Sequence, residues 1–169
     1  MKKDIKIMVG ALALSFALVV GFALWQGGKG EGEVEILGKV VDGVVVSPES
    51  YEVGEVRMKD GIVTKIYEVK NTTENSIRLK KIATSCMCTQ AKVKVGEKET
   101  RMFGMEGHGD KNPSVNLEIP ADETAIVTVE FDPAAHGPQG VGPFDRIVWL
   151  TFSDPAGIKE LKFNGTVIN

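Results

Sequence analysis

The sequence predicts an all-β domain, an antiparallel β-sandwich of about seven strands, preceded by a single N-terminal transmembrane helix. Three observations support this fold class. Short segments of alternating apolar and polar residues recur after residue 45, turn clusters rich in Gly, Pro, Asn and Asp separate them, and no stretch after Trp25 has helical periodicity. Without helices to cover its faces a parallel sheet is unfavourable, so we favour an antiparallel sandwich, with a small barrel as the alternative.

The N-terminal segment from Ile7 to Trp25 is uncharged and mostly apolar. At about 1.5 Å per residue, this helix would nearly match the ~30 Å thickness of a bilayer core. Lysines precede the segment and glutamates follow it, which favours a cytoplasmic N-terminus. We therefore expect residues 1–6 in the cytoplasm, residues 7–25 in the lipid bilayer as a signal anchor, and the rest of a single-pass cell-membrane protein outside the cytoplasm.

A cleaved signal peptide is the alternative for this segment, because Gly21 and Ala23 are small enough for a weak cleavage site. The apolar run is longer than the core of a typical signal peptide, which favours an uncleaved anchor.

Residues 26–44 are rich in glycine and charge and predict a flexible stalk, although 34–46 could add a strand. The remaining residues, 45–169, form the expected sandwich domain.

The predicted strands follow one another in the order of the chain. Segment 124–131 is the clearest, because Ala125, Val127, Val129 and Phe131 alternate with more polar neighbours. Turns are expected at residues 71–76 and 153–157. The expected strands are 62–69, 77–83, 114–120, 124–131, 146–152 and 159–168.

Charge and motif content exclude several functional classes. Without the charged residues of its first 25 positions, the chain has a net charge of about −5, which disfavours nucleic acid or an anionic membrane surface as a partner. The sequence has no G-x-S-x-G, no H-E-x-x-H and no phosphate-binding loop. We therefore expect a protein that is not an enzyme.

Four segments of the chain carry a family pattern, namely YEVGEV (51–56), YEVKNTTENSIRLKKIATSCMCT (67–89), VTVEFDP (127–133) and LKFNGTV (161–167). They resemble a bacterial family of exported domains of unknown function, which is similar to the immunoglobulin-like modules of the major sperm protein and Hydin type. The family signature T-S-C-G-C-T is the most specific element. The resemblance implies an immunoglobulin-like sandwich over residues 48–168 but no established activity.

This chain departs from the family pattern near the signature. Met87 replaces the usual glycine between the cysteines, and the segments 90–122 and 132–146 are longer than the pattern requires. These two longer segments contain both histidines of the chain.

The chemistry-bearing residues of the chain combine thiol, thioether and imidazole groups. Together these groups are the ligands that copper prefers, with Cu(I) at the soft end. A Cys2His2 zinc site is less favoured because it would leave the methionines without a role. The candidate metal ligands are Cys86, Cys88, Met102, Met105, His108 and His136.

Strand order decides whether these residues meet. If strand 77–83 ends at the cysteines and one strand, 114–120, returns the chain, then strand 124–131 runs parallel to 77–83 and ends at the same pole. The cysteines, the loop 102–110 and His136 would then converge. An even number of intervening strands would separate them.

Other readings of the cysteine pair stay open. Cys86 and Cys88 could pack in the core, as free cysteines often do. They could also form a disulfide, although at strand spacing their Cα atoms would lie about 6.5–7 Å apart, at the limit of disulfide geometry. In that case the domain would be a structural or adhesion module that binds a cell-surface protein through its loops or an edge strand.

Overall fold

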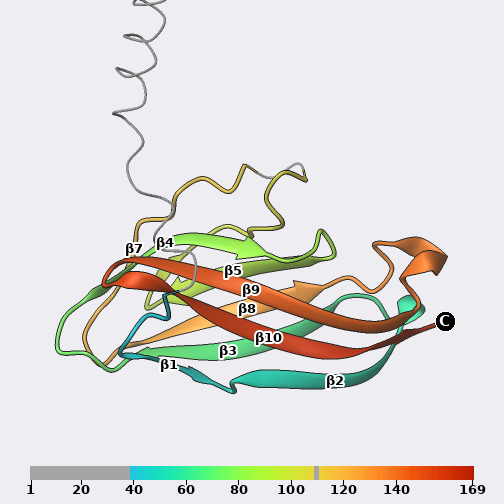
Figure 1. Cartoon of the computed structure of the whole chain (residues 1–169), viewed down its shortest axis with the longest axis horizontal. Coiled ribbons are helices and arrows are strands. Elements are labelled where there is room, and N and C mark those ends of the chain that lie inside the picture. Colours follow the sequence, from blue (N-terminus) through green and yellow to red (C-terminus); the bar gives the residue numbers. More distant parts are fainter. Residues whose placement is uncertain (1–38, 109–110) are drawn as a thin grey trace, which may run out of the picture. The chain divides into compact units, whose positions relative to one another are not determined.

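The described part of this computed structural model, residues 39–108 and 111–169, consists of two five-stranded β-sheets that pack face to face (Figure 1). The first sheet, in spatial order, contains β1 (Val44–Ser47), β3 (Val63–Asn71), β8 (Thr124–Phe131), β5 (Thr89–Val95) and β6 (Lys98–Glu99). The second sheet contains β2 (Ser50–Arg57), β10 (Ala156–Ile168), β9 (Gly142–Asp154), β4 (Ile77–Thr84) and β7 (Leu117–Ile119).

The prediction of an all-β sandwich is confirmed, and 3-10 turns at Met58–Asp60 and Gly137–Gly140 are the helical elements within the described residues. The predicted number of about seven strands is too low, because the described residues form ten. The second sheet is also mixed, since β2 pairs in parallel with β10. These two strands are far apart in the sequence, so no hairpin fixes their relative direction.

The predicted cytoplasmic segment 1–6, the membrane span 7–25 and most of the stalk lie outside the described residues and stay predictions. In the described part of the chain, no helix has the length and apolar character that a membrane crossing requires. The last residues assigned to the stalk are described. They lie against the sandwich, where Val41 is buried and its N–H donates to the carbonyl of Ile158 in β10 at 3.2 Å.

The core lies between the sheets and consists of the inward-facing residues of alternating strands. Strand β8 shows the pattern predicted for it, with every second residue buried. Tyr67 of β3 is fully buried, and its hydroxyl donates to the carbonyl of Lys162 in β10 at 2.6 Å. This bond links the two sheets through the core, where burial of each large side chain contributes about 1.5–3 kcal/mol.

The sandwich has two ends, which we call the cysteine pole and the asparagine pole. The cysteine pole comprises the turn 85–88 between β4 and β5 and the loop 132–141 between β8 and β9. The asparagine pole comprises the turn 72–76 between β3 and β4 and the turn 120–123 between β7 and β8. Figure 1 shows the cysteine pole at the right-hand end of the sheets and the asparagine pole at the left.

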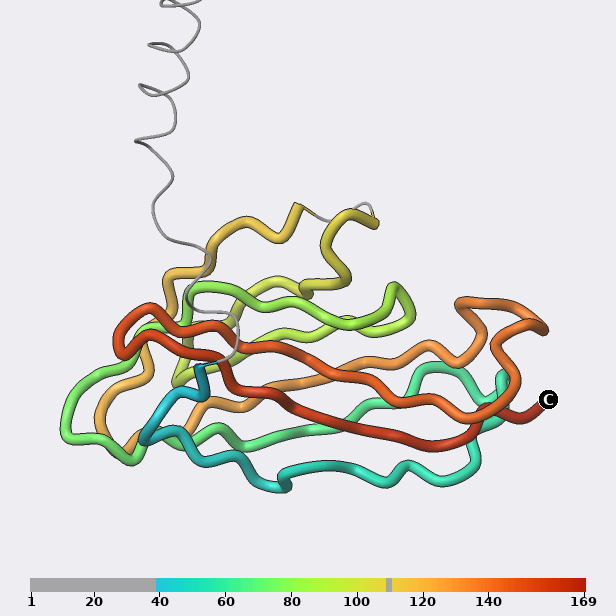
Figure 2. The backbone as a smooth tube through the Cα atoms, in the orientation of Figure 1, coloured from blue at the N-terminus to red at the C-terminus, as the bar shows by residue number. Residues whose placement is uncertain are grey.

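Strands β4 and β8 both end at the cysteine pole, because three strands separate them in the sequence. The predicted number of intervening strands was one, so that detail is wrong, but the number is odd in both cases and the direction is the same. The strand expected at 114–120 is present as β7, which is shorter than predicted. Residues 100–108 and 111–116, between β6 and β7, run beside β4 (Figure 2), and Phe103 forms a bridge with Ala91 of β5.

Candidate metal centre

The turn between β4 and β5 is held by the hydroxyl residues of the T-S-C-x-C-T motif. The Thr89 N–H donates to the carbonyl of Cys86 at 3.1 Å, and the Thr84 hydroxyl lies 3.0 Å from that same oxygen. Ser85 joins the turn to β9, because its N–H donates to the Ile147 carbonyl and its hydroxyl accepts from the Ile147 N–H, both at 2.9 Å. The hydroxyl groups therefore fix the backbone that carries the cysteines.

Cys86 and Cys88 are both free thiols in this turn. The N–H of Cys88 points at the sulfur of Cys86, at 3.5 Å. The Cys88 side chain is 3% exposed, Cys86 is half-buried, and Met87 between them is 52% exposed. The cysteines follow the end of their strand, as predicted, but they are not at strand spacing, because β4 ends at Thr84 and both lie in the turn after it.

His136 reaches the same sulfur from the loop after β8. The loop is attached to the turn by the Asp132 N–H, which donates to the carbonyl of Cys88 at 2.8 Å. The Asp132 carboxylate in turn accepts from the Ala134 N–H at 2.9 Å. The His136 side chain is exposed, and its Nε2 lies 3.1 Å from Cys86 Sγ. Two loops that are 50 residues apart therefore meet at the cysteine pole.

The ligand atoms of Cys86, Cys88 and His136 all lie within 4.8 Å of one another. Among the Cys, His, Asp and Glu residues of 39–108 and 111–169, no other group of three or more is so close. His108, which the sequence also proposed as a ligand, is exposed and does not belong to this group.

The two proposed thioether ligands lie on the segment that follows β6. Met102 and Met105 are half-buried on either side of Phe103, which is anchored to β5. Met105 lines a groove on the outer face of the second sheet, next to Ser85. Coordination by either methionine stays a prediction.

Arg146 is a member of the site that the sequence prediction missed. It lies near the start of β9, and its Nε–H donates to Cys88 Sγ at 3.2 Å. Its Nη1–H donates to the carbonyl of Asp145 at 2.8 Å, and the guanidinium lies 5.8 Å from the centre of the Phe144 ring. The position of Arg146 in the sequence could have indicated this role. It follows the His136 loop, and the strand that begins there must start at the same pole.

The contacts around the sulfurs distinguish the two thiols. Burial alone would raise the pKa of Cys86, but hydrogen bonds with Cys88 and His136 and the charge of Arg146 hold this pKa below its usual value. Burial and the neighbouring Cys86 raise the pKa of Cys88 despite the hydrogen bond from Arg146. Cys86 therefore ionises first. Burial opposes the charge of Arg146, yet its contacts with the two cysteines raise the pKa of the guanidinium, which stays a cation.

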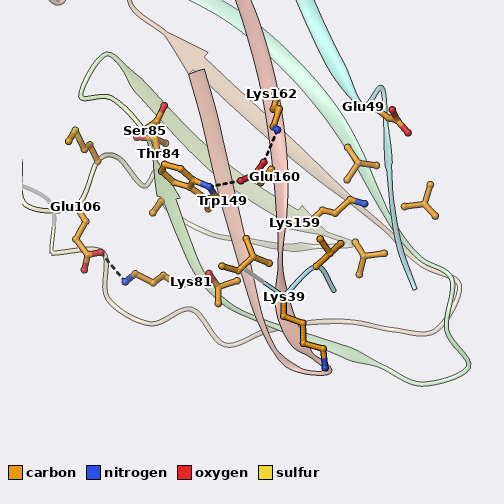
Figure 3. Close-up of a pocket in the computed structure, with 18 residues that line it drawn as sticks. Lys39, Glu49, Lys81, Thr84, Ser85, Glu106, Trp149, Lys159, Glu160 and Lys162 are labelled. Carbon is orange, nitrogen blue, oxygen red and sulfur yellow. Dashed lines mark hydrogen bonds and ion pairs between the residues drawn. The ribbon is translucent and has the colours of Figure 1, made fainter. Parts of the chain in front are cut away.

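A groove of about 910 Å³ runs along the outer face of the second sheet (Figure 3). Several of its polar side chains bind one another. Glu160 accepts from the Trp149 indole at 3.1 Å and pairs with Lys162 at 2.8 Å, and Lys81 pairs with Glu106 at 2.9 Å. The sulfur and imidazole cluster is the stronger candidate for chemistry, because its three ligand atoms converge within 4.8 Å.

Comparison with known families gives a match over residues 44–108, to the family described as protein of unknown function (DUF1573). The match includes β1 to β6 and both cysteines, and it ends before β7, β8 and His136. None of the curated proteins matches the chain.

The solved structures that are similar to this chain have little sequence in common with it. A protein of unknown function from Porphyromonas gingivalis W83 has a TM-score of 0.52 and 14% identity, over 73% of this chain and 46% of that one. PapD-like domain 7 of human CEP192 has a TM-score of 0.45 and 12% identity, over 75% and 86%. WR4, a C. elegans MSP family member, has 0.38 and 8%, over 73% and 98%. The chain spans less than half of the Porphyromonas protein, and the likeness concerns the fold alone.

Proposed function

We propose that this protein binds a soft metal ion, Cu(I), at the cysteine pole, through the sulfurs of Cys86 and Cys88 and the Nε2 of His136. The observation that carries the proposal is the convergence of these three atoms within 4.8 Å. Thiolate ligands select soft ions such as Cu(I) and Zn²⁺, and imidazole suits both metals, so copper and zinc are the ions to distinguish. The proposed role is capture or transfer of the ion rather than catalysis.

The separations of the three atoms are compatible with a shared ion. With metal–sulfur and metal–nitrogen bonds of about 2.3 and 2.0 Å, trigonal coordination places two sulfurs about 4.0 Å apart and a sulfur and a nitrogen about 3.7 Å apart. His136 Nε2 is 3.1 Å from Cys86 Sγ, so its ring would move outward by roughly 0.6 Å on binding. An exposed side chain in a loop permits such a movement.

Charge balance favours a monovalent ion. Two thiolates and Cu(I) together carry one negative charge, which the guanidinium of Arg146 offsets at the Cys88 sulfur. Two thiolates and Zn²⁺ carry no net charge, so the partly buried guanidinium of Arg146 would face a neutral site and lack an anionic partner. Structural zinc sites also prefer four protein ligands.

We further propose that the domain lies outside the cytoplasm, attached to the lipid bilayer through residues 7–25. The length of that apolar segment and the lysines before it support this placement. A membrane-attached domain with an exposed copper site would receive ions from, or deliver them to, a partner protein at the cell surface.

Copper titration of the full chain tests the proposal. The protein would be purified in mild detergent, reduced, and titrated anaerobically with Cu(I) against a competing Cu(I) chelator. The parent is expected to bind one ion per chain, and the double variant Cys86→Ser, Cys88→Ser to lose this binding. His136→Ala should weaken it by at least about tenfold, because loss of even an outer-shell partner has an effect of that size.

His108→Ala is the matched control, because the second histidine of the chain lies outside the cluster. It should leave Cu(I) affinity unchanged. The proposal fails if the double cysteine variant binds as much Cu(I) as the parent. A structural or adhesion module would then be the better account of this fold.

A further inference from the structure

We propose a second activity of the cysteine pole, thiol–disulfide exchange in the metal-free protein. In this reaction Cys86 attacks an external disulfide of a low-molecular-weight thiol, and Cys88 resolves the mixed disulfide. The reaction uses two of the sulfurs described above but needs no metal ion, so it does not depend on the proposed copper site.

Different exposure of the two sulfurs assigns the order of events. An external disulfide has to approach the attacking sulfur directly, and accessibility is one of the factors that set the rate of exchange. Cys86 is half-buried at the surface of the turn, whereas Cys88 is 3% exposed beneath it. A bulky disulfide therefore reaches Cys86, and Cys88 is left for the intramolecular step.

The turn also places the second sulfur close enough for that step. The two sulfurs lie within 4.8 Å of each other, and the N–H of Cys88 is directed at Cys86 Sγ. Disulfide formation brings two sulfurs to about 2.05 Å with Cα atoms usually 4.4–6.8 Å apart. Residues of a tight turn meet this requirement more readily than residues two apart on an extended strand, so the structure removes the main geometric objection to the pair.

Each sulfur has a polar group that suits its part in the reaction. The imidazole of His136 contacts Cys86 at 3.1 Å, and the guanidinium of Arg146 donates to Cys88 at 3.2 Å. Hydrogen bonds from charged donors are strongest to an anionic acceptor. Arg146 therefore supports the negative sulfur of Cys88 during the resolving attack.

The exchange balances without a further reactant. Cys86 gives its proton to water, and its thiolate attacks one sulfur of R–S–S–R, which forms a Cys86–S–S–R bond and releases one thiolate that takes up a proton. Cys88 then loses its proton to water and attacks Cys86 Sγ, which releases the second thiolate, again protonated by water. The two protein thiols are oxidised to one disulfide, and the external disulfide is reduced to two thiols.

Intact-mass spectrometry after exposure to oxidised glutathione tests the assignment. The reduced full chain would be stripped of metal with a chelator, mixed with oxidised glutathione under anaerobic conditions and quenched with acid. The parent is expected to lose two hydrogen atoms without a lasting adduct. Cys88→Ala should accumulate one glutathione on Cys86, and Cys86→Ala should react at least about tenfold more slowly than Cys88→Ala.

The same reactions in urea are the matched control, because unfolding exposes both thiols and should make the two single variants react at similar rates. If Cys88→Ala does not fold, brief alkylation of the reduced parent and peptide mapping give the same answer, with Cys86 labelled first. Equal rates for the two folded variants, or first labelling of Cys88, would overturn the proposal. A parent that keeps a glutathione adduct would also overturn it, and none of these outcomes bears on copper binding.

Discussion

The two poles of the sandwich are both built around motif residues, Asn71 at the end of β3 and the cysteines after β4, yet their polar side chains have different partners. At the asparagine pole, Asn71 is fully buried and its Nδ2 lies within 3.0 Å of the carbonyl oxygens of Asn75, Ile119 and Pro120. Its Oδ1 accepts from the N–H and the hydroxyl of Thr73. At the cysteine pole, the sulfurs interact with the side chains of His136 and Arg146.

This difference separates a structural motif from a reactive one. Backbone partners cannot move away without unfolding the turns they belong to, so the bonds of Asn71 join two turns into one rigid end. Side-chain partners can rotate, and the half-buried Cys86 is open to a ligand. Substitutions at the asparagine pole should therefore change stability, and those at the cysteine pole should change chemistry.

Asn71→Ala should have the largest effect on stability. The substitution removes the side-chain amide that donates to the buried carbonyl of Ile119, and the other groups bonded to this amide also lose their partner. Each polar group left unpaired in this way costs about 1–3 kcal/mol. We expect the free energy of unfolding, measured by urea denaturation, to fall by about 3 kcal/mol. Cu(I) affinity per folded chain should stay within about threefold of the parent.

Asn75→Ala is the control for that substitution, because Asn75 is exposed and contributes its backbone carbonyl to the network. Its effect should be within about 0.5 kcal/mol. If the two variants unfold at the same urea concentration, the amide of Asn71 does not hold the asparagine pole together.

The sequence predicted several strands that have one buried face, but it missed β2 and β5. Strand β8 alternates strictly between buried and partly exposed residues, and it was placed correctly. Strand β2 lies at a sheet edge with Val56 as its buried residue, so it has little hydrophobic alternation to read. Strand β5 does alternate, through Thr89, Ala91 and Val93, but it falls in a segment that was treated as a long insertion.

The site was predictable where topology alone brings loops together. An odd number of strands between β4 and β8 was enough to place His136 beside the cysteines. The contact of Arg146 with Cys88 was not predictable, because it depends on where β9 begins and on how its first side chains are directed. The spacing M-x-x-M-x-x-H suggested a free ligand loop, but Phe103 in its middle is buried and paired with Ala91, which ties the segment to β5.

Arg146→Gln should have an intermediate effect on stability and a distinct effect on metal preference. Loss of the charged hydrogen bond to Cys88 is expected to cost about 1 kcal/mol in urea denaturation. Because the cation that would offset the negative charge of the proposed Cu(I) site is removed, competition titrations should show the ratio of Cu(I) to Zn²⁺ affinity falling by about tenfold.

Arg78→Gln provides the comparison for Arg146→Gln, since Arg78 forms an exposed ion pair with Glu118 on the second sheet. It should change stability by less than about 1 kcal/mol and leave the metal ratio unchanged. A Cu(I) to Zn²⁺ ratio that is the same in Arg146→Gln and the parent would remove the charge argument for a monovalent ion, while leaving metal binding itself intact.

Met87→Ala should have the smallest effect on folding, and it tests how open the cysteine pole is. Its side chain is 52% exposed, so the free energy of unfolding should change by less than about 0.5 kcal/mol. An exposed thioether between the two cysteines is, however, a soft ligand that can hold Cu(I) as the ion enters or leaves. We therefore expect the rate of Cu(I) transfer to a chelator, followed by stopped-flow absorbance, to change by at least threefold while the equilibrium affinity stays within about twofold. Unchanged transfer rates would show that the cysteine pole exchanges its ion without Met87.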